Sequence, residues 1–459
     1  MKRHGFVKSL SLALLVCVFL LLPILNVSAQ KTSDVLATRG AFDWRRYEGK
    51  TIRLLGCAGP YNKTIQESFA EFEKKTGIKV DATFLPETDY FNKVQLVAAA
   101  KSGEYDVYMV GFPNMIDWVP AGWLEPLDGY IESSSLTSKE FDVSDFYPNV
   151  LDNVKWDGVK GHKFGSGKGA KTWGLPLGVM INMLMYRKDI FDKYNLKVPT
   201  TIPEAIKVGK FIQEHEKGMY GIATRGVKEM QQLYGGVWST LKSYGATDFD
   251  KRLTPQFSSP EMIQGLNDWK EMIKEIGNIN NWASMTWYDV ESDMMSGKAA
   301  MILDACSIGG WINTGEDCVA KGKVAFAPPL MGPDASKARS FMWAWSISIA
   351  SSSKDKGPSW YFAQFVTSKE SQLKGSDMSW PTRKSVFNDS GFRKENEGQH
   401  DFFGAWEKTI QFAGFEFSPV PGINDWGYKL AGEIQNVVLG QSDAKKAMDE
   451  EVKYYKKNF

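Results

Sequence analysis

Residues 51 to 110 alternate short apolar runs with helical patterns, and this order constrains the fold more than any other feature. The segment 61–76 has the apolar residues Ile65, Phe69 and Phe72 at helical spacing, and residues 88–101 repeat that kind of pattern. The apolar runs around these helices, each expected to form a strand, are 51–55, 78–85 and 105–110. Strands separated by helices in this way predict an α/β fold with a parallel sheet and crossover helices.

The N-terminal residues form a unit of their own. Basic residues at the start are followed by an apolar stretch over 10–25 and then by the small residues Val27, Ser28 and Ala29. This order is typical of a signal peptide covering 1–29 that is cleaved after Ala29. An uncleaved membrane anchor is the alternative. We expect a periplasmic protein whose residues 30–47 form a loosely held polar arm.

Composition excludes several classes of protein. The 459 residues are 43% hydrophobic and 24% charged, which argues against a disordered or fibrous chain. A formal net charge of +1 gives no basic footprint for nucleic acid or for an anionic membrane. The four histidines, one of them in the signal peptide, argue against a histidine-based metal site, so we expect no metal and no cofactor.

Two local patterns leave alternatives open. Cys306 and Cys318 are twelve residues apart and suit a disulfide in an oxidising compartment, but buried free thiols are the other interpretation. The segment 155–171 contains five glycines, yet it lacks the Lys-Ser/Thr ending of a phosphate-binding loop. We therefore expect a surface loop or hairpin there.

Several longer motifs occur in an order that resembles a known family. They are "FAEFEKKTGIKVDATF" (69–84), "AAAKSGEYDVYMVG" (98–111), "WGLPLGVMINMLMYRKDIFDKYNL" (173–196), "SGKAAMIL" (296–303), "SISIASSSK" (346–354) and "LGQSDAKKAMDE" (439–450). Together they resemble the family 1 extracellular solute-binding proteins, the maltose-binding and related sugar-binding proteins of ABC importers. The resemblance covers about 50–455. Each motif is weak alone, and their shared order carries the argument.

The resemblance implies a fold and a division of the chain. The expected fold is the two-lobed periplasmic-binding-protein fold of type II, with a mostly parallel sheet flanked by helices in each lobe and three crossings between lobes. Lobe 1 is expected to take 48–177 and 304–352, and lobe 2 to take 181–300 and 356–459. A ligand would lie between the lobes, which close on it by a hinge motion.

Candidate ligand contacts come from two arguments. Parallel sheets bind ligands beyond the carboxyl ends of their strands, which favours Tyr61, Glu87, Phe112 and Asn114, each just after an expected strand. The family resemblance adds further positions. These are Asn182, Trp287, Asp304, Trp343, Arg383 and Trp426.

Each candidate also has a structural alternative. Aromatic candidates can be core or loop packing, and Trp426 in particular can anchor a helix. Asp304 can cap a turn, Arg383 can pair with a carboxylate, and Asn182 can satisfy backbone groups at the hinge. The bulky "WAW" at 343–345 departs from the glycine-rich stretch common in the family and would narrow the site.

The function that these observations favour is capture of a sugar or polyol by a monomer that delivers it to the membrane subunits of an ABC importer. Aromatic residues make up 13% of the chain and suit the apolar faces of a sugar. The alternatives are a binder of a polyamine or metal chelate and, less favoured, a secreted carbohydrate-active enzyme. Glu87, Asp304 and Asp425 offer carboxylates for the latter, but many other acids do so too.

Overall fold

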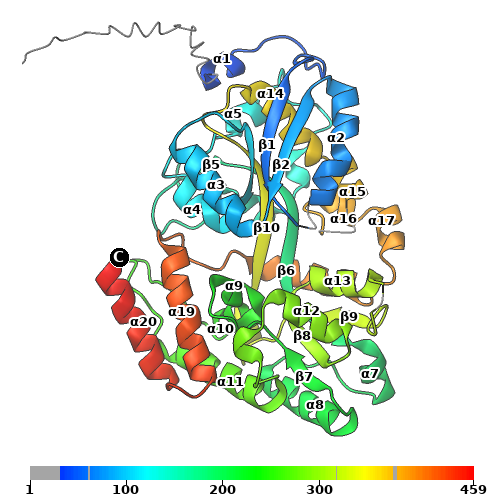
Figure 1. Cartoon of the computed structure of the whole chain (residues 1–459), viewed down its shortest axis with the longest axis vertical. Coiled ribbons are helices and arrows are strands. Elements are labelled where there is room, and N and C mark those ends of the chain that lie inside the picture. Colours follow the sequence, from blue (N-terminus) through cyan, green and yellow to red (C-terminus); the bar gives the residue numbers. More distant parts are fainter. Residues whose placement is uncertain (1–30, 60–61, 317, 376–379) are drawn as a thin grey trace, which may run out of the picture.

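The computed structural model describes residues 31–59, 62–316, 318–375 and 380–459. The expected signal peptide and Tyr61 lie outside these ranges. The described chain forms two lobes, one above the other in Figure 1, connected by the long strands β6 (Leu175–Arg187) and β10 (Ser340–Ile349). Across these ranges, we find no helix with the length and apolar character needed to cross a membrane.

Lobe 1 contains the parallel strands that the sequence predicts. Strand β1 (Thr51–Cys57) pairs in parallel with β2 (Lys79–Leu85) and with β3 (Val107–Gly111). Helices α2 (Asn62–Thr76) and α3 (Glu87–Ala99) connect these strands, which confirms the predicted order. The shorter elements of this lobe are α4 (Met115–Trp118), α5 (Asp128–Ile131), α6 (Pro148–Asp152), β4 (Lys155–Trp156) and β5 (Lys171–Thr172).

The glycine-rich segment forms the predicted hairpin. Strands β4 and β5 pair antiparallel, and all five glycines between them have positive φ angles, which other residues rarely adopt. The hairpin touches lobe 2, because the Gly161 backbone N–H donates to the Pro419 carbonyl at 2.8 Å.

Lobe 2 is built around the second half of β6. Strands β8 (Ala299–Ala305) and β9 (Val324–Ala327) pair antiparallel with β6, and β7 (Tyr220–Ala223) pairs in parallel with β8. The antiparallel pairs arise because β6 enters from lobe 1, whereas β8 runs back toward it. The helices of this lobe include α7 (Lys188–Lys193), α8 (Ile202–His215), α9 (Met230–Gln232), α10 (Trp238–Ser243), α11 (Pro260–Ile276), α12 (Trp287–Met295), α13 (Ser307–Thr314), α18 (Phe402–Thr409), α19 (Ile423–Val438) and α20 (Ala444–Asn458).

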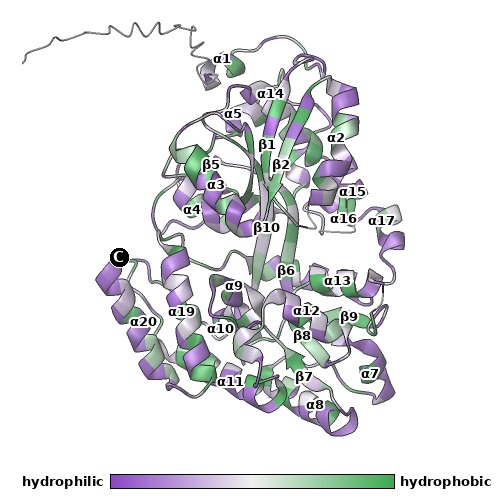
Figure 2. Ribbon diagram, in the orientation of Figure 1, coloured by the Kyte–Doolittle hydropathy of each residue, from purple (hydrophilic) through white to green (hydrophobic). Residues whose placement is uncertain are grey.

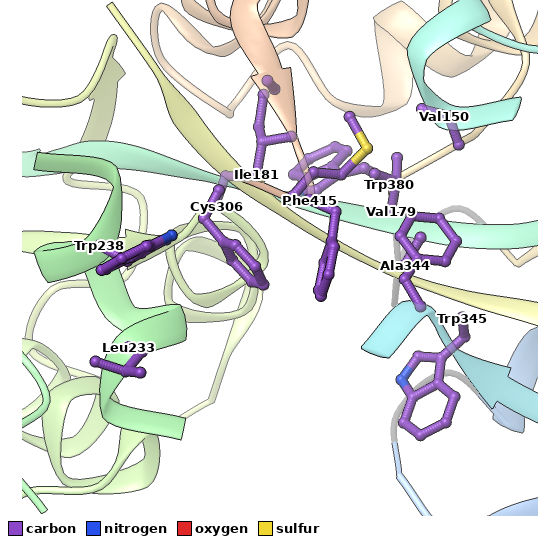
Figure 3. Packing of buried hydrophobic residues seen from close by; sticks show 14 of the residues in the cluster. Val150, Val179, Ile181, Leu233, Trp238, Cys306, Ala344, Trp345, Trp380 and Phe415 are labelled. Atoms are coloured by element: carbon purple, nitrogen blue, oxygen red, sulfur yellow. The ribbon is translucent and has the colours of Figure 1, made fainter. Parts of the chain in front are cut away.

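The crossing strands lie at the centre of the molecule. The strand order β2-β1-β3-β10-β6-β8-β7 places β10 and β6 between the two lobes. All thirteen residues of β6 are buried, and Figure 3 shows its residues Val179 and Ile181 near Ala344 of β10 and near Phe415. Figure 2 shows the contrast with α20, a largely hydrophilic helix at the edge of lobe 2. A third crossing lies between α17 (Ser390–Glu395) and α18.

Two segments lie in the opposite lobe from the one predicted. Helix α13 packs on α12, and β9 pairs with β6 at Leu184 to Arg187, so 306–327 belongs to lobe 2. Helix α14 (Lys356–Val366) packs against α2 and β1, and α15 (Lys369–Lys374) packs against α2, so both belong to lobe 1. The prediction was wrong there because the chain crosses along β10, after β9 is complete.

The N-terminal arm is packed against lobe 1 rather than loosely held. Helix α1 (Thr32–Leu36) donates a hydrogen bond from Thr32 Oγ1 to Glu125 Oε1, whose carboxylate also pairs with Lys356 at 3.3 Å. Trp44 and Tyr47 then pack edge-on against the Tyr361 ring, with centroids 5.6 and 5.0 Å away. Burial of these aromatic rings outweighs the polar composition of the segment.

Candidate functional site

The carboxyl ends of strands from both lobes meet at the boundary between them. In lobe 1, β3 ends at Gly111, which lies opposite Trp345 of the crossing strand β10. In lobe 2, β8 ends at Ala305, opposite Asn182 of the crossing strand β6. Because such ends are where α/β sheets hold ligands, side chains just beyond them are the first candidates. The interlobe site described below comprises Cys57, Glu87, Asn114 and Trp343 of lobe 1 with Arg225, Tyr234, Tyr288 and Glu291 of lobe 2.

Glu87 faces charges of the other lobe. It is the first residue of α3, separated by one residue from the end of β2, and its side chain is accessible to water although protein surrounds much of it. Desolvation by the surrounding protein raises the pKa of its carboxyl, Arg225 opposes that rise, and Glu229 adds to it. Arg225 and Glu229 belong to lobe 2. Charged groups of lobe 2 therefore act on the Glu87 carboxyl of lobe 1.

Arg225 is held rigidly by a buried carboxylate. Its Nε donates to Asp304 Oδ2 at 2.8 Å, its Nη2 donates to Asp304 Oδ1 at 2.6 Å, and its Nη1 donates to the Gln231 carbonyl at 3.0 Å. Asp304, near the end of β8, is fully buried. A Cβ at Gly235 would lie 2.6 Å from Arg225 Cγ and Cδ, so that glycine leaves the space for the side chain. A two-point ion pair of this kind fixes the guanidinium plane.

Two tyrosines of lobe 2 flank these charges. Tyr234 lies in an irregular turn over Leu233–Val237, where Gly236 has a φ of 92°, and its ring stacks on Phe341 at 5.0 Å. Burial raises its pKa, Glu87 adds to the rise, and Arg225 opposes it. Tyr288, 64% exposed, has its pKa raised by desolvation and by Glu87 and Cys57 of lobe 1. The Glu87 charge of lobe 1 therefore acts on both hydroxyl groups of lobe 2.

Glu291 adds a second carboxyl group on the lobe 2 side. It lies three residues after Tyr288 on α12, a helix that begins with a reciprocal capping bond between Thr286 and Asp289. Desolvation raises the pKa of Glu291 to about 7. Within the described ranges, no cluster of three or more acidic, histidine or cysteine side chains is arranged to hold a metal ion.

Comparison with known families assigns this architecture. A family model described as a bacterial extracellular solute-binding protein matches residues 58–373. The chain belongs to this family. Membership confirms the resemblance seen in the sequence motifs.

Characterised relatives of this solute-binding protein include two named for polyols. The erythritol/L-threitol-binding protein of Mycolicibacterium smegmatis is 29% identical over 412 residues, which cover 88% of this chain and 85% of that protein. The mannitol-binding protein of Pseudomonas aeruginosa is 27% identical over 277 residues, covering 59% of this chain and 58% of its own length.

Solved structures confirm the predicted type II fold of this solute-binding protein. An ABC transporter solute-binding protein of Agrobacterium radiobacter in complex with ribitol superposes with a TM-score of 0.75 and 22% identity, over 90% of this chain and 99% of that one. Maltose-bound MalE3 of T. maritima gives a TM-score of 0.74 at 19% identity, over 90% of this chain and 100% of that one.

Four of the predicted contacts lie in or beside the interlobe site of this solute-binding protein. Glu87, Asn114 and Trp343 belong to it. Trp287 lies at its edge, where its ring packs 3.9 Å from Tyr288 and 5.6 Å from Trp311. Asp304 is close by but fully buried, so its place is behind Arg225 rather than against a ligand.

Two aromatic candidates were wrong because their side chains fill the core. Phe112 follows β3 as predicted, but its ring is fully buried. Trp426 is fully buried at the start of α19 and packs against Phe249, Phe257 and Phe417. The alternative interpretation of Trp426 as a helix anchor is the correct one.

Two polar candidates were wrong because other protein groups engage them. Arg383 is 2% exposed, donates to the carbonyls of Thr367 and Asp142, and pairs with Asp145 at 3.3 Å. Asn182 is 1% exposed, and its amide donates to Ser239 Oγ at 3.0 Å within the hinge.

The cysteines are free thiols in the structure, which corrects the disulfide interpretation. Cys306 is buried before α13, and Cys318 Sγ donates to the Met295 carbonyl at 3.5 Å. We expect three reactive thiols per molecule when the protein, cleaved after Ala29, is denatured without reductant and titrated with a thiol reagent. A count of one would show that two cysteines are joined.

Sequence reasoning missed Arg225, Tyr234, Tyr288 and Glu291. One signal was present for Arg225, which comes two residues after the short apolar run that forms β7. The double glycine at 235 and 236 marked the irregular turn that carries Tyr234. Tyr288 and Glu291 lie within the helix α12, and nothing in the sequence around them distinguishes them from other residues of a helix.

Proposed function

We propose that this chain captures a small polyhydroxylated solute, a polyol or a sugar, between its lobes and delivers it to an ABC importer. One observation carries the proposal. Glu87 follows β2 of lobe 1, Arg225 follows β7 of lobe 2, and the Arg225 charge opposes the rise in the pKa of the Glu87 carboxyl. A solute that bonds to both groups holds the lobes together.

The side chains around these charges match a hydroxyl-rich ligand. A carboxylate accepts hydrogen bonds from hydroxyl groups, and a guanidinium donates to them, with greater strength than neutral partners provide. Tyr234 and Trp343, whose ring centroids are 5.1 Å apart, offer flat apolar surfaces for C–H groups. The relatives named for erythritol, L-threitol and mannitol point to the same ligand class.

The lobes close because only the closed form lets the ligand contact both of them. A ligand shifts the balance of open and closed forms by its difference in affinity for the two. Moving the closed fraction from 1:99 to 99:1 takes about 5.5 kcal/mol of that difference. Two or three charge-assisted hydrogen bonds, at about 1.5–3 kcal/mol each, supply an energy of this size.

The proposal includes the setting in which the protein works. The leader over 1–29 directs export to the periplasm with cleavage after Ala29, and the mature chain acts as a monomer. The membrane subunits of the importer recognise the closed form. The protein binds its solute without transforming it, so no product forms during prolonged incubation with the ligand.

An amine ligand is the second candidate, and the acidic groups near the site favour it. Glu87, Glu229 and Glu291 all carry carboxyls, and a polyamine would pair with them. Arg225 opposes that interpretation, because a fixed guanidinium repels a cation. A ligand panel therefore includes putrescine beside neutral polyols and sugars.

Titration calorimetry with erythritol, ribitol, mannitol, maltose and putrescine tests the function. We expect at least one neutral compound to bind, and Glu87→Gln to weaken that binding about 10- to 100-fold, the effect of losing a charged hydrogen bond. Glu132→Gln, an exposed residue of lobe 1, is the matched control and should leave affinity unchanged. If only putrescine binds, the ligand is an amine and not a polyol or sugar. If a neutral compound binds equally well to wild type and to Glu87→Gln, its binding site does not include Glu87.

A further inference from the structure

Trp343 occupies a position where the two lobes touch. It belongs to the crossing strand β10, where it lies opposite Met180 of β6, and its side chain is half-buried. Its indole reaches β3 of lobe 1 on one side. On the other side its ring centroid is 5.1 Å from that of Tyr234 in lobe 2.

The neighbours of the indole hold it in place. A Cβ at Gly111 would lie 2.9 Å from Trp343 Cζ2 and 3.1 Å from Cη2, so the ring packs directly on the backbone of β3. Trp345 meets it edge-on at 5.5 Å. Tyr234 is itself fixed by a nearly parallel stack on Phe341, with an interplanar angle of 8°. Gly111, Trp345 and Tyr234 therefore pack against the indole, which keeps its remaining surface exposed.

Polar groups lie beside this ring on both lobes. Asn114 Oδ1, which is buried and has no hydrogen-bond donor within the described ranges, lies 3.1 Å from the Cβ position of the same Gly111. Across the boundary, Gly235 packs on Arg225 immediately after Tyr234. Asn114 therefore lies beside the indole on the lobe 1 side, and Arg225 lies behind the turn that carries Tyr234 on the lobe 2 side.

We propose that the Trp343 indole is the residue that limits ligand length, so that the site takes a short polyol or a single sugar ring and excludes a disaccharide. This inference rests on the proposed function and specifies the size of its ligand. The fold alone leaves size open, because structural relatives include complexes with ribitol and with maltotetraose. An indole is about as large as a sugar ring, so removing it would vacate space for one more unit.

Calorimetry with erythritol, ribitol, mannitol and maltose on four proteins tests the inference. For Trp343→Ala we expect the affinity for maltose, relative to the best short polyol, to rise at least tenfold above the wild-type ratio. Trp343→Phe should give a smaller shift in the same direction and guards against a misfolded alanine variant. Trp123→Ala, which removes a half-buried indole near the far end of β10, is the control and should leave the ratio unchanged.

Gly111→Ala supplies a test in the opposite direction. Its φ of −74° suits alanine, so the added methyl acts by pushing the Trp343 indole and the Asn114 side chain away from the backbone of β3. Weaker binding of the longest accepted polyol, with erythritol affected less, is the expected result. An unchanged ratio in both Trp343 variants, or wild-type protein that prefers maltose, would overturn the size limit. Wild-type protein that binds none of the four compounds would instead overturn the proposed function itself.

Discussion

Replacing Trp426 with alanine is expected to lower the free energy of unfolding by about 3–5 kcal/mol, the usual cost of removing a buried tryptophan. The indole is fully buried among Phe249, Phe257 and Phe417, with ring centroids 5.6, 5.7 and 6.1 Å away. The cavity would open in the core of lobe 2, behind α19. Chemical denaturation should show the loss, and calorimetry on the folded variant should show unchanged ligand affinity.

Tyr428 on the same helix provides the control for Trp426. Its side chain is 50% exposed, and the Lys228 ammonium lies over its ring, 5.5 Å from the ring centroid. Tyr428→Ala should therefore cost about 0.5–1 kcal/mol. If Trp426→Ala weakens ligand binding without lowering the free energy of unfolding, Trp426 contacts the ligand and is not a core residue.

The sequence predicts the fold well because apolar periodicity reports burial directly. The parallel strands of lobe 1 are short apolar runs between amphipathic helices, and both patterns survive in the structure. The same argument locates Glu87 and Asn114, because residues just after parallel strands lie at one edge of a sheet. Position along the chain is sufficient for these two residues.

Where the other candidate side chains lie depends on contacts that the sequence does not display. Arg225 is oriented by Asp304, 79 residues later, and by the absence of a side chain at Gly235. Trp426 and Arg383 are residue types common in ligand sites, yet core packing and carbonyl groups engage them just as well. Residue type predicts what a side chain can bind, whereas the fold decides whether a ligand reaches it.

The same lobe holds a buried carboxyl group that makes stability depend on pH. Glu451 on α20 is fully buried, and neither of its carboxyl oxygens has a hydrogen-bond donor within the described ranges. Burial raises its pKa from 4.5 to about 8, Lys429 opposes the rise, and Glu433 adds to it. The folded protein therefore holds a proton on Glu451 at neutral pH that the unfolded chain releases.

Glu451→Gln is accordingly expected to remove a pH-dependent loss of stability. The pKa of Glu451 is higher in the folded protein than in the unfolded chain. The stability that the protonated carboxyl contributes to wild type is therefore fully present below pH 4.5 and is lost as the pH rises through about 8. At pH 8.5 to 9 the glutamine variant should be more stable than wild type by roughly 3–5 kcal/mol relative to their difference at pH 4.5. Denaturant unfolding of both proteins across this range measures that change, and other titrating groups cancel in the comparison.

Glu271→Gln, which changes an exposed residue of α11, is the control and should show the same dependence of stability on pH as wild type. Parallel curves for wild type and Glu451→Gln would mean that Glu451 is solvated or paired in solution and titrates normally.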